Sequence, residues 1–238
     1  MKSRIEILST AFLETQLCKK AANKDIQIDV ISFIEVNKIE DNFDRVKAML
    51  AEKCTVIFTS VNSVKALSGL FSSPPRWSAY CLENATLNEV QRLFKDSPIL
   101  GTAANAKELA EKIISDRNNK KIFFFCGKSR RDELPQMVYD AGIEMEEIVV
   151  YETVLTPKNI SKHYDGILFF SPSAVESFYS CNSTGSESTL FAIGGTTAQT
   201  IRKYSSAKIN VAKSAGREQM IDDLIDYFNS KENNGTTV

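Results

Sequence analysis

The sequence predicts an α/β protein with two parallel β-sheets, on three observations. Short runs of β-branched or aromatic residues alternate with longer segments of helical period, which is typical of parallel α/β architecture. Ten such runs in a chain of 238 residues are too many for one open sheet, which favours two sheets of five strands each. An apolar pattern from the first half also returns later, with Ser60 recurring as Ser171. Such a return is the mark of a repeated structural unit.

Each predicted strand is four to six residues long, and most are rich in β-branched or aromatic side chains, as buried strands of a parallel sheet are. In chain order the predicted strands are Arg4–Ser9, Ile28–Phe33, Thr55–Ser60, Trp77–Cys81, Pro98–Gly101, Lys121–Cys126, Glu146–Tyr151, Gly166–Ser171, Thr189–Ile193 and Lys208–Val211.

Apolar residues at helical spacing occupy the segments between these strands. The predicted helices are Asp41–Lys53, Ser63–Phe71, Leu87–Lys95, Ala104–Arg117, Arg131–Ala141, Ala174–Tyr179, Thr197–Lys203 and Arg217–Phe228.

The repeat divides the chain into four pieces. A three-strand unit, in which Phe58–Ser60 returns as Phe169–Ser171, keeps its apolar register without a gap at an offset of 111 residues. A looser two-strand repeat matches Arg4–Phe33 with Lys121–Tyr151. The order of these pieces allows either two domains in tandem or one domain inserted in the other. The periodicity does not choose between them.

Composition and charge exclude a polyanion-binding surface. Hydrophobic residues make up 43% and charged residues 25%, which is ordinary for a globular protein and too apolar for a disordered chain. The 29 lysine and arginine residues against 30 aspartate and glutamate residues leave a formal net charge of -1. No overall field therefore attracts nucleic acid or an anionic membrane, and we expect neither as a partner.

Cysteine and histidine usage argues against a disulfide framework, a zinc site and histidine-based catalysis. The five cysteines are Cys18, Cys54, Cys81, Cys126 and Cys181. They are odd in number, widely spaced and form no C-x-x-C pair, so we expect buried structural thiols. His163 is the only histidine and lies in a polar stretch, so we expect it at the surface.

The two ends of the sequence carry no targeting or spanning segment. The start lacks a long apolar stretch of the signal-peptide kind, and nowhere do about 18 apolar residues run together. We therefore expect a cytoplasmic protein, and a monomer because no long apolar stripe calls for a partner. Residues 231–238 lack apolar anchors and are expected to form a frayed tail.

Polar residues that follow the predicted strands are the first candidates for a site, because ligands of open parallel sheets bind beyond the carboxyl ends of the strands. Ser60 and Asn62 follow one strand, and Ser171 and Ser173 follow another. Ser171 precedes Pro172 at an apolar helix, which fits an N-cap followed by N1. Such turns offer backbone N–H groups to an anion, although most of them serve only as helix caps.

A glycine pair and two hydroxyls open the helix after the strand at Thr189–Ile193. These residues are Gly194, Gly195, Thr196 and Thr197. Glycines let the backbone approach a ligand, and hydroxyls donate hydrogen bonds without charge. The pattern is not a nucleotide-binding motif. Its repeat partner keeps a threonine as Thr86 but has Glu83 where Gly194 lies, and that carboxylate opposes an anionic ligand unless it points away.

Three cations and a tyrosine complete the candidates. Lys128, Arg130 and Arg131 follow the strand Lys121–Cys126, where a solvated helix start is the commoner explanation. Arginine nevertheless holds a carboxylate in a bidentate geometry that lysine cannot offer. Tyr151 ends another predicted strand. An aromatic residue in a strand is usually a packing residue, but at a domain junction its phenol would face a cleft.

Four motifs occur in a fixed order along nearly the whole chain. They are Phe58-Thr-Ser-Val-Asn-Ser-Val64, Gly127 to Leu134 with Gly142 and Val149-Val-Tyr-Glu-Thr153, Phe169-Phe-Ser-Pro-Ser-Ala-Val175, and Ala192-Ile-Gly-Gly-Thr-Thr-Ala198. Together they resemble the uroporphyrinogen-III synthase family. The sequence departs from the family pattern at Gly195, where a proline is common, and at Glu83, where a glycine is common.

The resemblance implies an architecture. It implies two flavodoxin-like domains with five-stranded parallel sheets, one inserted in the other and joined by a two-stranded linker. Domain 1 would comprise residues 1–34 and 156–238, domain 2 residues 38–149, and the linkers residues 35–37 and 150–155. The active site would lie in the cleft between the domains.

The resemblance also implies an activity. The protein would be a lyase of tetrapyrrole and haem biosynthesis that closes linear hydroxymethylbilane to uroporphyrinogen III, with loss of water and inversion of ring D. No metal or organic cofactor would take part. Loss of hydroxide from a pyrrolic CH2OH group is assisted by the ring nitrogen, so the enzyme needs little strong acid or base and mainly positions the ring ends.

Carried over position by position, the resemblance makes Tyr151 the candidate catalytic residue, which would assist departure of the hydroxyl. The candidate substrate-binding residues, for the carboxylate arms, are Ser60, Asn62, Thr86, Arg131, Ser171, Ser173, Gly194, Thr196 and Thr197.

Two alternatives from other classes stay open at this point. One is a non-catalytic two-domain binding protein for a small anionic ligand, and the absent export signal disfavours its periplasmic form. The other is a nucleotide-sugar transferase with paired α/β domains, for which 238 residues are few and no nucleotide loop is present.

Overall fold

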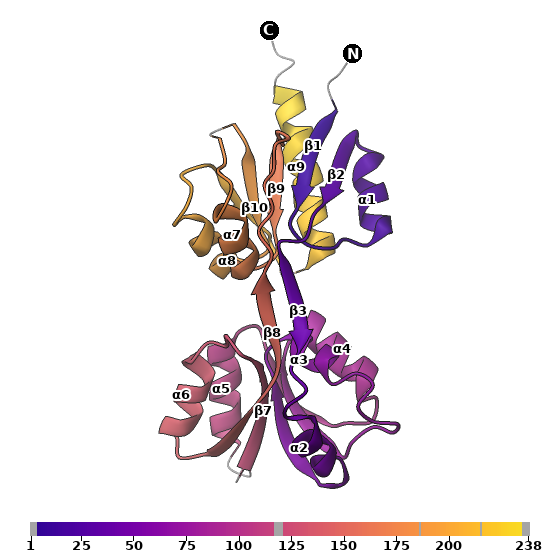
Figure 1. Cartoon of the computed structure of the whole chain (residues 1–238), viewed down its shortest axis with the longest axis vertical. Helices are drawn as coiled ribbons and strands as arrows, with labels where there is room; N and C mark the ends of the chain where they lie inside the picture. The colour runs from indigo at the N-terminus through magenta and orange to yellow at the C-terminus, as the bar shows by residue number, and fades with distance from the viewer. Residues whose placement is uncertain (1–3, 117–120, 186, 215, 235–238) are drawn as a thin grey trace. The chain divides into compact units, whose positions relative to one another are not determined.

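The structure is a computed structural model that describes residues 4–116, 121–185, 187–214 and 216–234. The chain divides into two compact units. Unit 1 comprises Met1–Glu35 and Val154–Val238, and unit 2 comprises Val36–Thr153. Each unit is a mixed α/β structure in which helices cover both faces of a β-sheet (Figure 1).

The sheet of unit 1 has five parallel strands in the order β11-β10-β9-β1-β2. Its strands are β1 (Ile5–Ser9), β2 (Ile26–Val30), β9 (Gly166–Phe169), β10 (Thr189–Ala192) and β11 (Ile209–Val211). Its helices are α1 (Thr15–Ala22), α7 (Pro172–Tyr179), α8 (Gly195–Ile201) and α9 (Arg217–Asn234).

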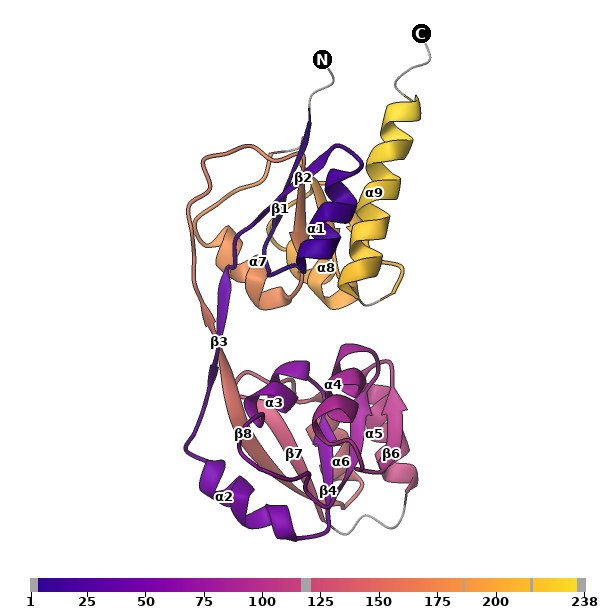
Figure 2. The same cartoon turned by 90° about the vertical axis from the view of Figure 1, so that its right-hand side faces the viewer.

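The helices of unit 1 divide between the two faces of the sheet. Helices α1 and α9 lie side by side (Figure 2) and pack on the face that presents Ile7 and Phe191. Helices α7 and α8 pack on the opposite face, against Leu8, Phe169 and Leu190. Side chains of neighbouring strand residues point to opposite faces, so the near-continuous apolar runs of β1, β9 and β10 supply both cores at once.

The sheet of unit 2 has six strands in the order β3-β8-β7-β4-β5-β6. They are β3 (Ile34–Lys38), β4 (Cys54–Phe58), β5 (Trp77–Leu82), β6 (Ile99–Ala103), β7 (Lys121–Gly127) and β8 (Glu144–Leu155). The pairs among β4 to β8 are parallel. The helical segments are α2 (Phe43–Ala48), the 3-10 turn η1 (Met49–Ala51), α3 (Val61–Ala66), α4 (Ala85–Leu93), α5 (Ala106–Ser115) and α6 (Glu133–Asp140).

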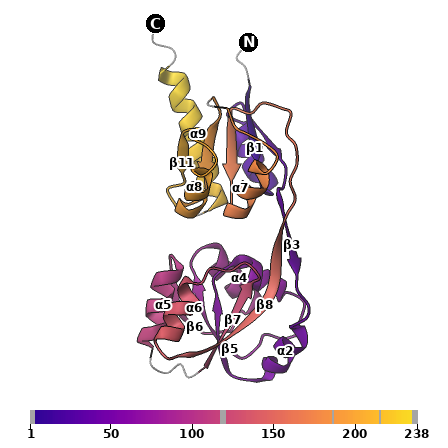
Figure 3. The same ribbon diagram turned by 60° about the vertical axis from the view of Figure 1, so that its left-hand side comes forward.

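Two separate cores also cover the sheet of unit 2. One core, which we call the aromatic core, contains Phe58, Trp77, Phe94 and Phe125 and lies under α2, α3 and α4. Its rings are in close contact: Trp77 stacks on Phe125 at a centroid distance of 5.3 Å and packs in a tilted arrangement against Phe94 at 5.7 Å. The other core lies under α5 and α6, which run side by side (Figure 3).

Each sheet has one place where the chain reverses its direction of winding. In unit 1 the chain winds outward from β1 to β2 and, on the other side, from β9 to β11, so the reversal lies between β1 and β9. In unit 2 the corresponding reversal lies between β4 and β7. At such a point the helices on either side cover opposite faces, which leaves a crevice beyond the carboxyl ends of the two strands.

Most predicted strands are confirmed with shifted ends, and the differences follow from pairing. Strand β2 is Ile26–Val30 rather than Ile28–Phe33, because its pairing with β1 spans only these residues. Strand β8 reaches Leu155, because β7 ends opposite Tyr151 and β8 continues beside β3. The sheet of unit 2 therefore has six strands where five were expected, with the half-polar β3 at its edge.

Two smaller expectations were wrong, and one helix lies outside the predicted set. That helix is α1, whose apolar residues are Leu17, Cys18, Ala21 and Ala22. The expected tail is helical from Lys231 to Asn234, since α9 extends that far, and residues 235–238 lie outside the described residues. Cys181 is exposed and Cys18 is half-buried, whereas Cys54, Cys81 and Cys126 are buried as expected.

Other expectations have simpler outcomes. His163 is exposed, as predicted. The predicted helix Ala104–Arg117 corresponds to α5, and Arg117 lies outside the described residues. Among the described helices, none combines the length and apolar character needed to cross a membrane.

Candidate active site

Ser60 stands at the reversal point of unit 2, directly after β4. Its extended backbone (φ -145°) makes it the N-cap of α3, and its Oγ accepts a hydrogen bond of 3.1 Å from the Asn62 backbone N–H. The Ser63 hydroxyl donates to the Ser60 carbonyl at 2.7 Å, which closes the turn. The serine predicted at this strand end is thus a helix cap, and its side chain is held in one orientation.

Tyr151 reaches Ser60 from β8, two strands away. The Tyr151 hydroxyl donates to Ser60 Oγ at 3.1 Å, across the end of the intervening strand β7. The two residues are 91 positions apart in sequence. The candidate catalytic residue and a candidate binding residue are therefore in direct contact at the carboxyl edge of unit 2.

The surroundings of Tyr151 keep its phenol protonated. Burial raises the pKa of Tyr151 above its ordinary value of 10.0, and the hydrogen bond to Ser60 offsets this only in part. A half-buried phenol with a raised pKa is a neutral hydrogen-bond donor at physiological pH. It suits the stabilisation of a departing hydroxide better than the removal of a proton.

The loop after β7 carries the predicted arginines, and Arg130 forms ion pairs with acidic residues of the same unit. Arg130 forms a fork with Glu147, with Nη2 at 2.7 Å from Oε1, and also contacts Asp132. Its charge is therefore already neutralised within the unit, which argues against Arg130 as a carboxylate ligand. Arg131 is exposed in the same loop, just before α6.

Ser171 repeats the role of Ser60 in unit 1. It is the N-cap of α7, with Pro172 in the first turn, and its Oγ accepts from the Ala174 backbone N–H at 3.1 Å. Ser173 is half-buried in the same turn. The predicted serine-proline cap is confirmed, and the two serines lie at the reversal point of the unit.

The glycine-threonine segment opens α8 on the neighbouring strand end. Gly194 is the N-cap residue of α8, and Gly195 and Thr196 are exposed. Thr197 is only 3% exposed, and its repeat partner Thr86 in α4 is only 6% exposed. Because β9 pairs with β10, this segment lies next to the turn at Ser171, whereas the two buried threonines present little side-chain surface to a ligand.

Glu83, whose carboxylate would oppose an anionic ligand at the loop between β5 and α4, is exposed at the end of β5. Its backbone N–H donates to the Ala103 carbonyl at 3.0 Å. Asn84 follows with a positive φ of 60°. The turn before α4 is therefore more strained than the glycine turn before α8, as expected where a non-glycine residue adopts this conformation.

Sequence reasoning missed the end of β1, which faces β9 at the reversal point of unit 1. Thr10 is fully buried there, and its hydroxyl donates to the Leu168 carbonyl at 2.8 Å. Phe12 is 64% exposed two residues later. Thr10 is a polar residue directly after the predicted strand Arg4–Ser9, so its place at a strand end is visible in the sequence, whereas the apolar Phe12 carries no such signal.

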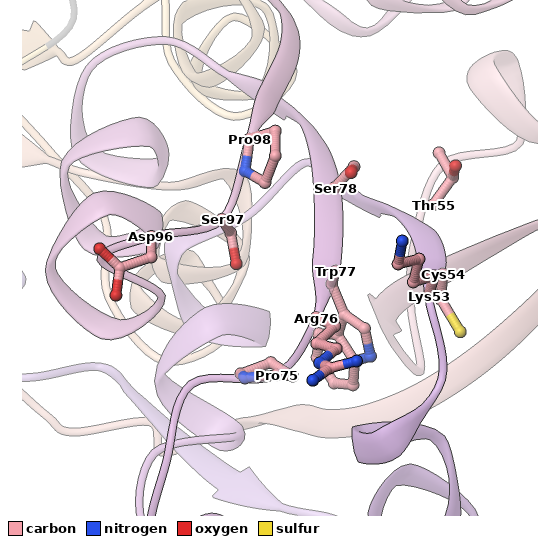
Figure 4. Close-up of a pocket in the computed structure, with 10 residues that line it drawn as sticks. All are labelled: Lys53, Cys54, Thr55, Pro75, Arg76, Trp77, Ser78, Asp96, Ser97 and Pro98. Carbon is pink, nitrogen blue, oxygen red and sulfur yellow. The ribbon is translucent and has the colours of Figure 1, made fainter.

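A separate cavity of about 570 Å³ lies at the opposite, amino edge of the unit 2 sheet (Figure 4). Lys53, Arg76 and Ser97 line it together with the buried Trp77. Its cations follow η1 and precede β5, on the edge where helix carboxyl ends place partial negative charge. The described residues include no group of three or more His, Cys, Asp or Glu side chains able to hold a metal ion.

Comparison with known proteins places this arrangement in one family. A family model described as "Uroporphyrinogen-III synthase HemD" matches residues 15–222. A crystal structure of uroporphyrinogen-III synthetase from Helicobacter pylori is similar over 94% of this chain and 99% of its own, with a TM-score of 0.67 and 18% identity. A crystal structure of a mutant uroporphyrinogen III synthase from the extremely thermophilic bacterium Thermus thermophilus is similar over 95% of this chain and 99% of its own, with a TM-score of 0.65 and 11% identity.

Proposed function

Since the chain belongs to the uroporphyrinogen-III synthase family, we propose that its carboxyl strand edges bind hydroxymethylbilane and that Tyr151 assists its closure to uroporphyrinogen III. The family consists of lyase-type enzymes of haem biosynthesis. The observation that carries the proposal is the hydrogen bond of 3.1 Å between the Tyr151 hydroxyl and Ser60 at the reversal point of unit 2.

The reaction divides into departure of the hydroxyl and formation of the ring. The C–O bond of the terminal CH2OH group breaks, the pyrrole nitrogen donates its electron pair, and the oxygen leaves as water once it has gained a proton. A neutral phenol such as that of Tyr151 stabilises the developing hydroxide by hydrogen bonding or by donating its proton. The new carbon–carbon bond then forms at the substituted carbon of ring D, and the bond from that carbon to the methylene bridge of ring C breaks. The bridge rejoins ring D at its unsubstituted α-carbon, and the proton lost from that carbon balances the one consumed.

Ring D must be inverted, which is a matter of position more than of acid or base strength. Spontaneous closure of hydroxymethylbilane gives the uninverted I isomer. An enzyme that holds the two ends of the chain in the geometry of attack at the substituted carbon gains most of its rate from orientation. Helix caps with fixed side chains, such as Ser60 and Ser171, suit that task.

The substrate carries acetate and propionate arms on its rings, for which the candidate binding residues are Ser60, Asn62, Thr86, Arg131, Ser171, Ser173, Gly194, Thr196 and Thr197. All of them except the buried Thr86 and Thr197 have accessible groups that suit carboxylates. Most of them lie at the starts of α3, α4, α7 and α8, where backbone N–H groups and hydroxyls gather. Local donors of this kind can hold a polycarboxylate although the formal net charge of the chain is -1.

The strand orders support two flavodoxin-like domains, residues 1–34 with 156–238 and residues 38–149. In unit 1 the order β2-β1-β9-β10-β11 is the 2-1-3-4-5 arrangement of that fold. In unit 2 the order β8-β7-β4-β5-β6 is the same arrangement with the last two strands of the chain placed first. Expression of residues 38–149 alone tests the assignment, because an independent domain unfolds cooperatively and a fragment does not.

The function is tested by incubating the purified protein with hydroxymethylbilane, oxidising the products and separating the uroporphyrin isomers. We expect mainly the III isomer. Formation of the I isomer alone at the rate of the uncatalysed reaction would contradict the proposal and favour a binding protein for an anionic ligand. Chelator-treated protein is expected to keep its activity, since the proposed reaction uses no cofactor. Light scattering during size exclusion tests the accompanying proposal of a monomer, and fractionation tests that of a cytoplasmic location.

A further inference from the structure

We infer that Gly127 and a β-bulge at Val150 together position Tyr151, so that Gly127 is a positioning residue for the reaction. The inference deepens the proposed function and rests on it for the role of the Tyr151 hydroxyl. The geometric part, which concerns where the ring lies, stands on the pairing of β7 with β8 and on the space above Gly127.

The pairing of β7 with β8 changes register at its last step. Cys126 pairs with Val149, but Gly127 pairs with Tyr151, so Val150 has no partner on β7. An extra residue of this kind is a β-bulge, which bends the strand and redirects the side chains that follow it.

The bulge moves Tyr151 to the other face of the sheet. Along β8, Val149 packs with the core under α5 and α6, and Val150 packs with the aromatic core. Strict alternation would return Tyr151 to the side of Val149. Tyr151 instead packs against the aromatic core, on the same side as Phe58 and the α3 helix that Ser60 caps. Without the bulge the phenol would face away from Ser60.

Gly127 provides the space that the ring needs to cross β7. A Cβ atom at position 127 would lie 2.6 Å from Cζ of Tyr151 and 2.9 Å from both Cε2 and the hydroxyl oxygen. These distances are well inside van der Waals contact, which begins near about 3.5 Å between carbon atoms. Any side chain at position 127 would therefore displace the ring of Tyr151, and with it the hydroxyl that donates to Ser60.

The backbone beside the bulge is also held. The Lys128 backbone N–H donates to the Tyr151 carbonyl at 2.9 Å, so the end of β8 cannot easily move away from β7. Strain from a side chain at position 127 must then be relieved by rotation of the Tyr151 side chain. The glycine is required here for close approach of a ring, not for an unusual backbone dihedral.

The test is Gly127→Ala in the full chain, assayed with hydroxymethylbilane. A displacement of the hydroxyl by about 1 Å is expected to lower kcat about 100-fold with little change in KM, as misplacement of a catalytic group does. The loss should match that of Tyr151→Phe. In a Tyr151→Ala background, Gly127→Ala should lower kcat no further, because the ring that it displaces is gone.

Gly101→Ala is the matched control. Gly101 is also a strand glycine of unit 2 beside a tyrosine ring, since its added Cβ would lie 3.2 Å from Tyr80, but it lies on β6, away from Tyr151. Gly101→Ala is expected to keep kcat within about twofold, because it leaves the Tyr151 ring in place.

Two further readouts separate positioning from general damage. In protein labelled with 13C at tyrosine Cζ, the signal assigned to Tyr151 should shift in Gly127→Ala and stay in place in Gly101→Ala. If Gly127→Ala lowers the melting temperature, the Tyr151→Ala background should abolish that further loss, measured against Tyr151→Ala alone, because the clash needs both side chains. This comparison keeps the test decisive even if the single variant folds poorly.

The outcomes distinguish the inference from the proposed function. If the unaltered protein forms no III isomer, the proposed function fails, while the signal shift and the comparison of melting temperatures still test the geometry. If the unaltered protein forms the III isomer and Gly127→Ala keeps its kcat, the inference alone is wrong. Additive losses of kcat in the double variant would overturn it as well.

Discussion

The two carboxyl edges of this protein are built on one repeat but differ in what their side chains do. Ser60 and Ser171 are repeat partners, and each caps the helix that follows. In unit 2, Tyr151 donates to the capping serine at 3.1 Å. In unit 1, the position that the looser repeat matches to Tyr151 is Phe33, which is fully buried and packs edge-on against Phe178 at 5.3 Å.

The two units also differ in the space at the end of the strand next to the capping serine, which is β1 in unit 1 and β7 in unit 2. Thr10 stands at the repeat position of Gly127, and its hydroxyl bonds to the Leu168 carbonyl on β9. Unit 1 therefore has a side chain where unit 2 has room for a ring. The carboxyl edge of unit 2 thus has a side-chain donor in a fixed position, whereas that of unit 1 has helix caps and backbone amides. The acid step is then expected to depend on unit 2, with unit 1 contributing to binding.

Among the variants that test this difference between the two edges, Tyr151→Phe should have the largest effect on kcat. Removal of the hydroxyl should lower kcat about 100-fold, at the low end for general acids, because the pyrrole nitrogen still assists departure of the leaving group. Steady-state kinetics with hydroxymethylbilane measure it. An unchanged turnover in a folded variant would show that the role assigned to Tyr151 is wrong.

The pH dependence of kcat should identify the same group. Burial raises the pKa of Tyr151, so its proton-donating form persists to a higher pH than that of a free phenol, which titrates near 10.0. Turnover is expected to stay level from neutral pH to about 10 and to fall only above it. The fall should be absent in Tyr151→Phe, and a fall of equal size at the same pH in that variant would assign the titration to another group.

Ser60→Ala and Ser171→Ala form a matched pair across the two edges. Each should cost about 1 kcal/mol of unfolding free energy through the lost helix cap. Only Ser60→Ala should also lower kcat, by about tenfold, because it removes the acceptor that orients the Tyr151 phenol. Denaturant titration and kinetics measure the two quantities. Equal effects of both variants on kcat would remove the distinction between the edges.

The smallest expected effect is that of Arg131→Ala. An exposed cation that binds a carboxylate contributes little in water, so KM should rise about fivefold with kcat unchanged. Added salt should weaken substrate binding to the unaltered protein more than to the variant. Arg131→Lys keeps the charge and should recover part of the loss. A KM equal to that of the unaltered protein would exclude Arg131 from the binding residues.

Local signals accounted for much of the fold. The serine-proline pair at Ser171 predicted a helix start that the structure has, because capping depends on a few neighbouring residues. The apolar runs at β4 and β7 predicted buried strands, because both faces of these strands are covered by helices. The amphipathic pattern of Thr15–Ala22 is as clear as that of α4, so α1 could also have been predicted from its sequence.

The sequence alone also indicated the candidate residues at the strand ends, since parallel strands bring their carboxyl ends to one edge. It did not indicate which of them touch. The Tyr151–Ser60 contact joins residues 91 positions apart, and it depends on the order β8-β7-β4, which no local pattern encodes. Likewise, the ion pair of Arg130 with Glu147 forms because the loop after β7 follows a strand that is paired with β8.

What the sequence determined by itself is thus the α/β class, the repeat and the set of polar strand ends, because each depends on residue spacing within one element. The tertiary structure alone decided that Tyr151 faces Ser60. That choice depends on a one-residue bulge at Val150 and on the missing side chain of Gly127, features whose meaning appears only when β7 and β8 are paired. Side-chain direction in a strand alternates with every residue, so a single change of register decides which face a phenol occupies.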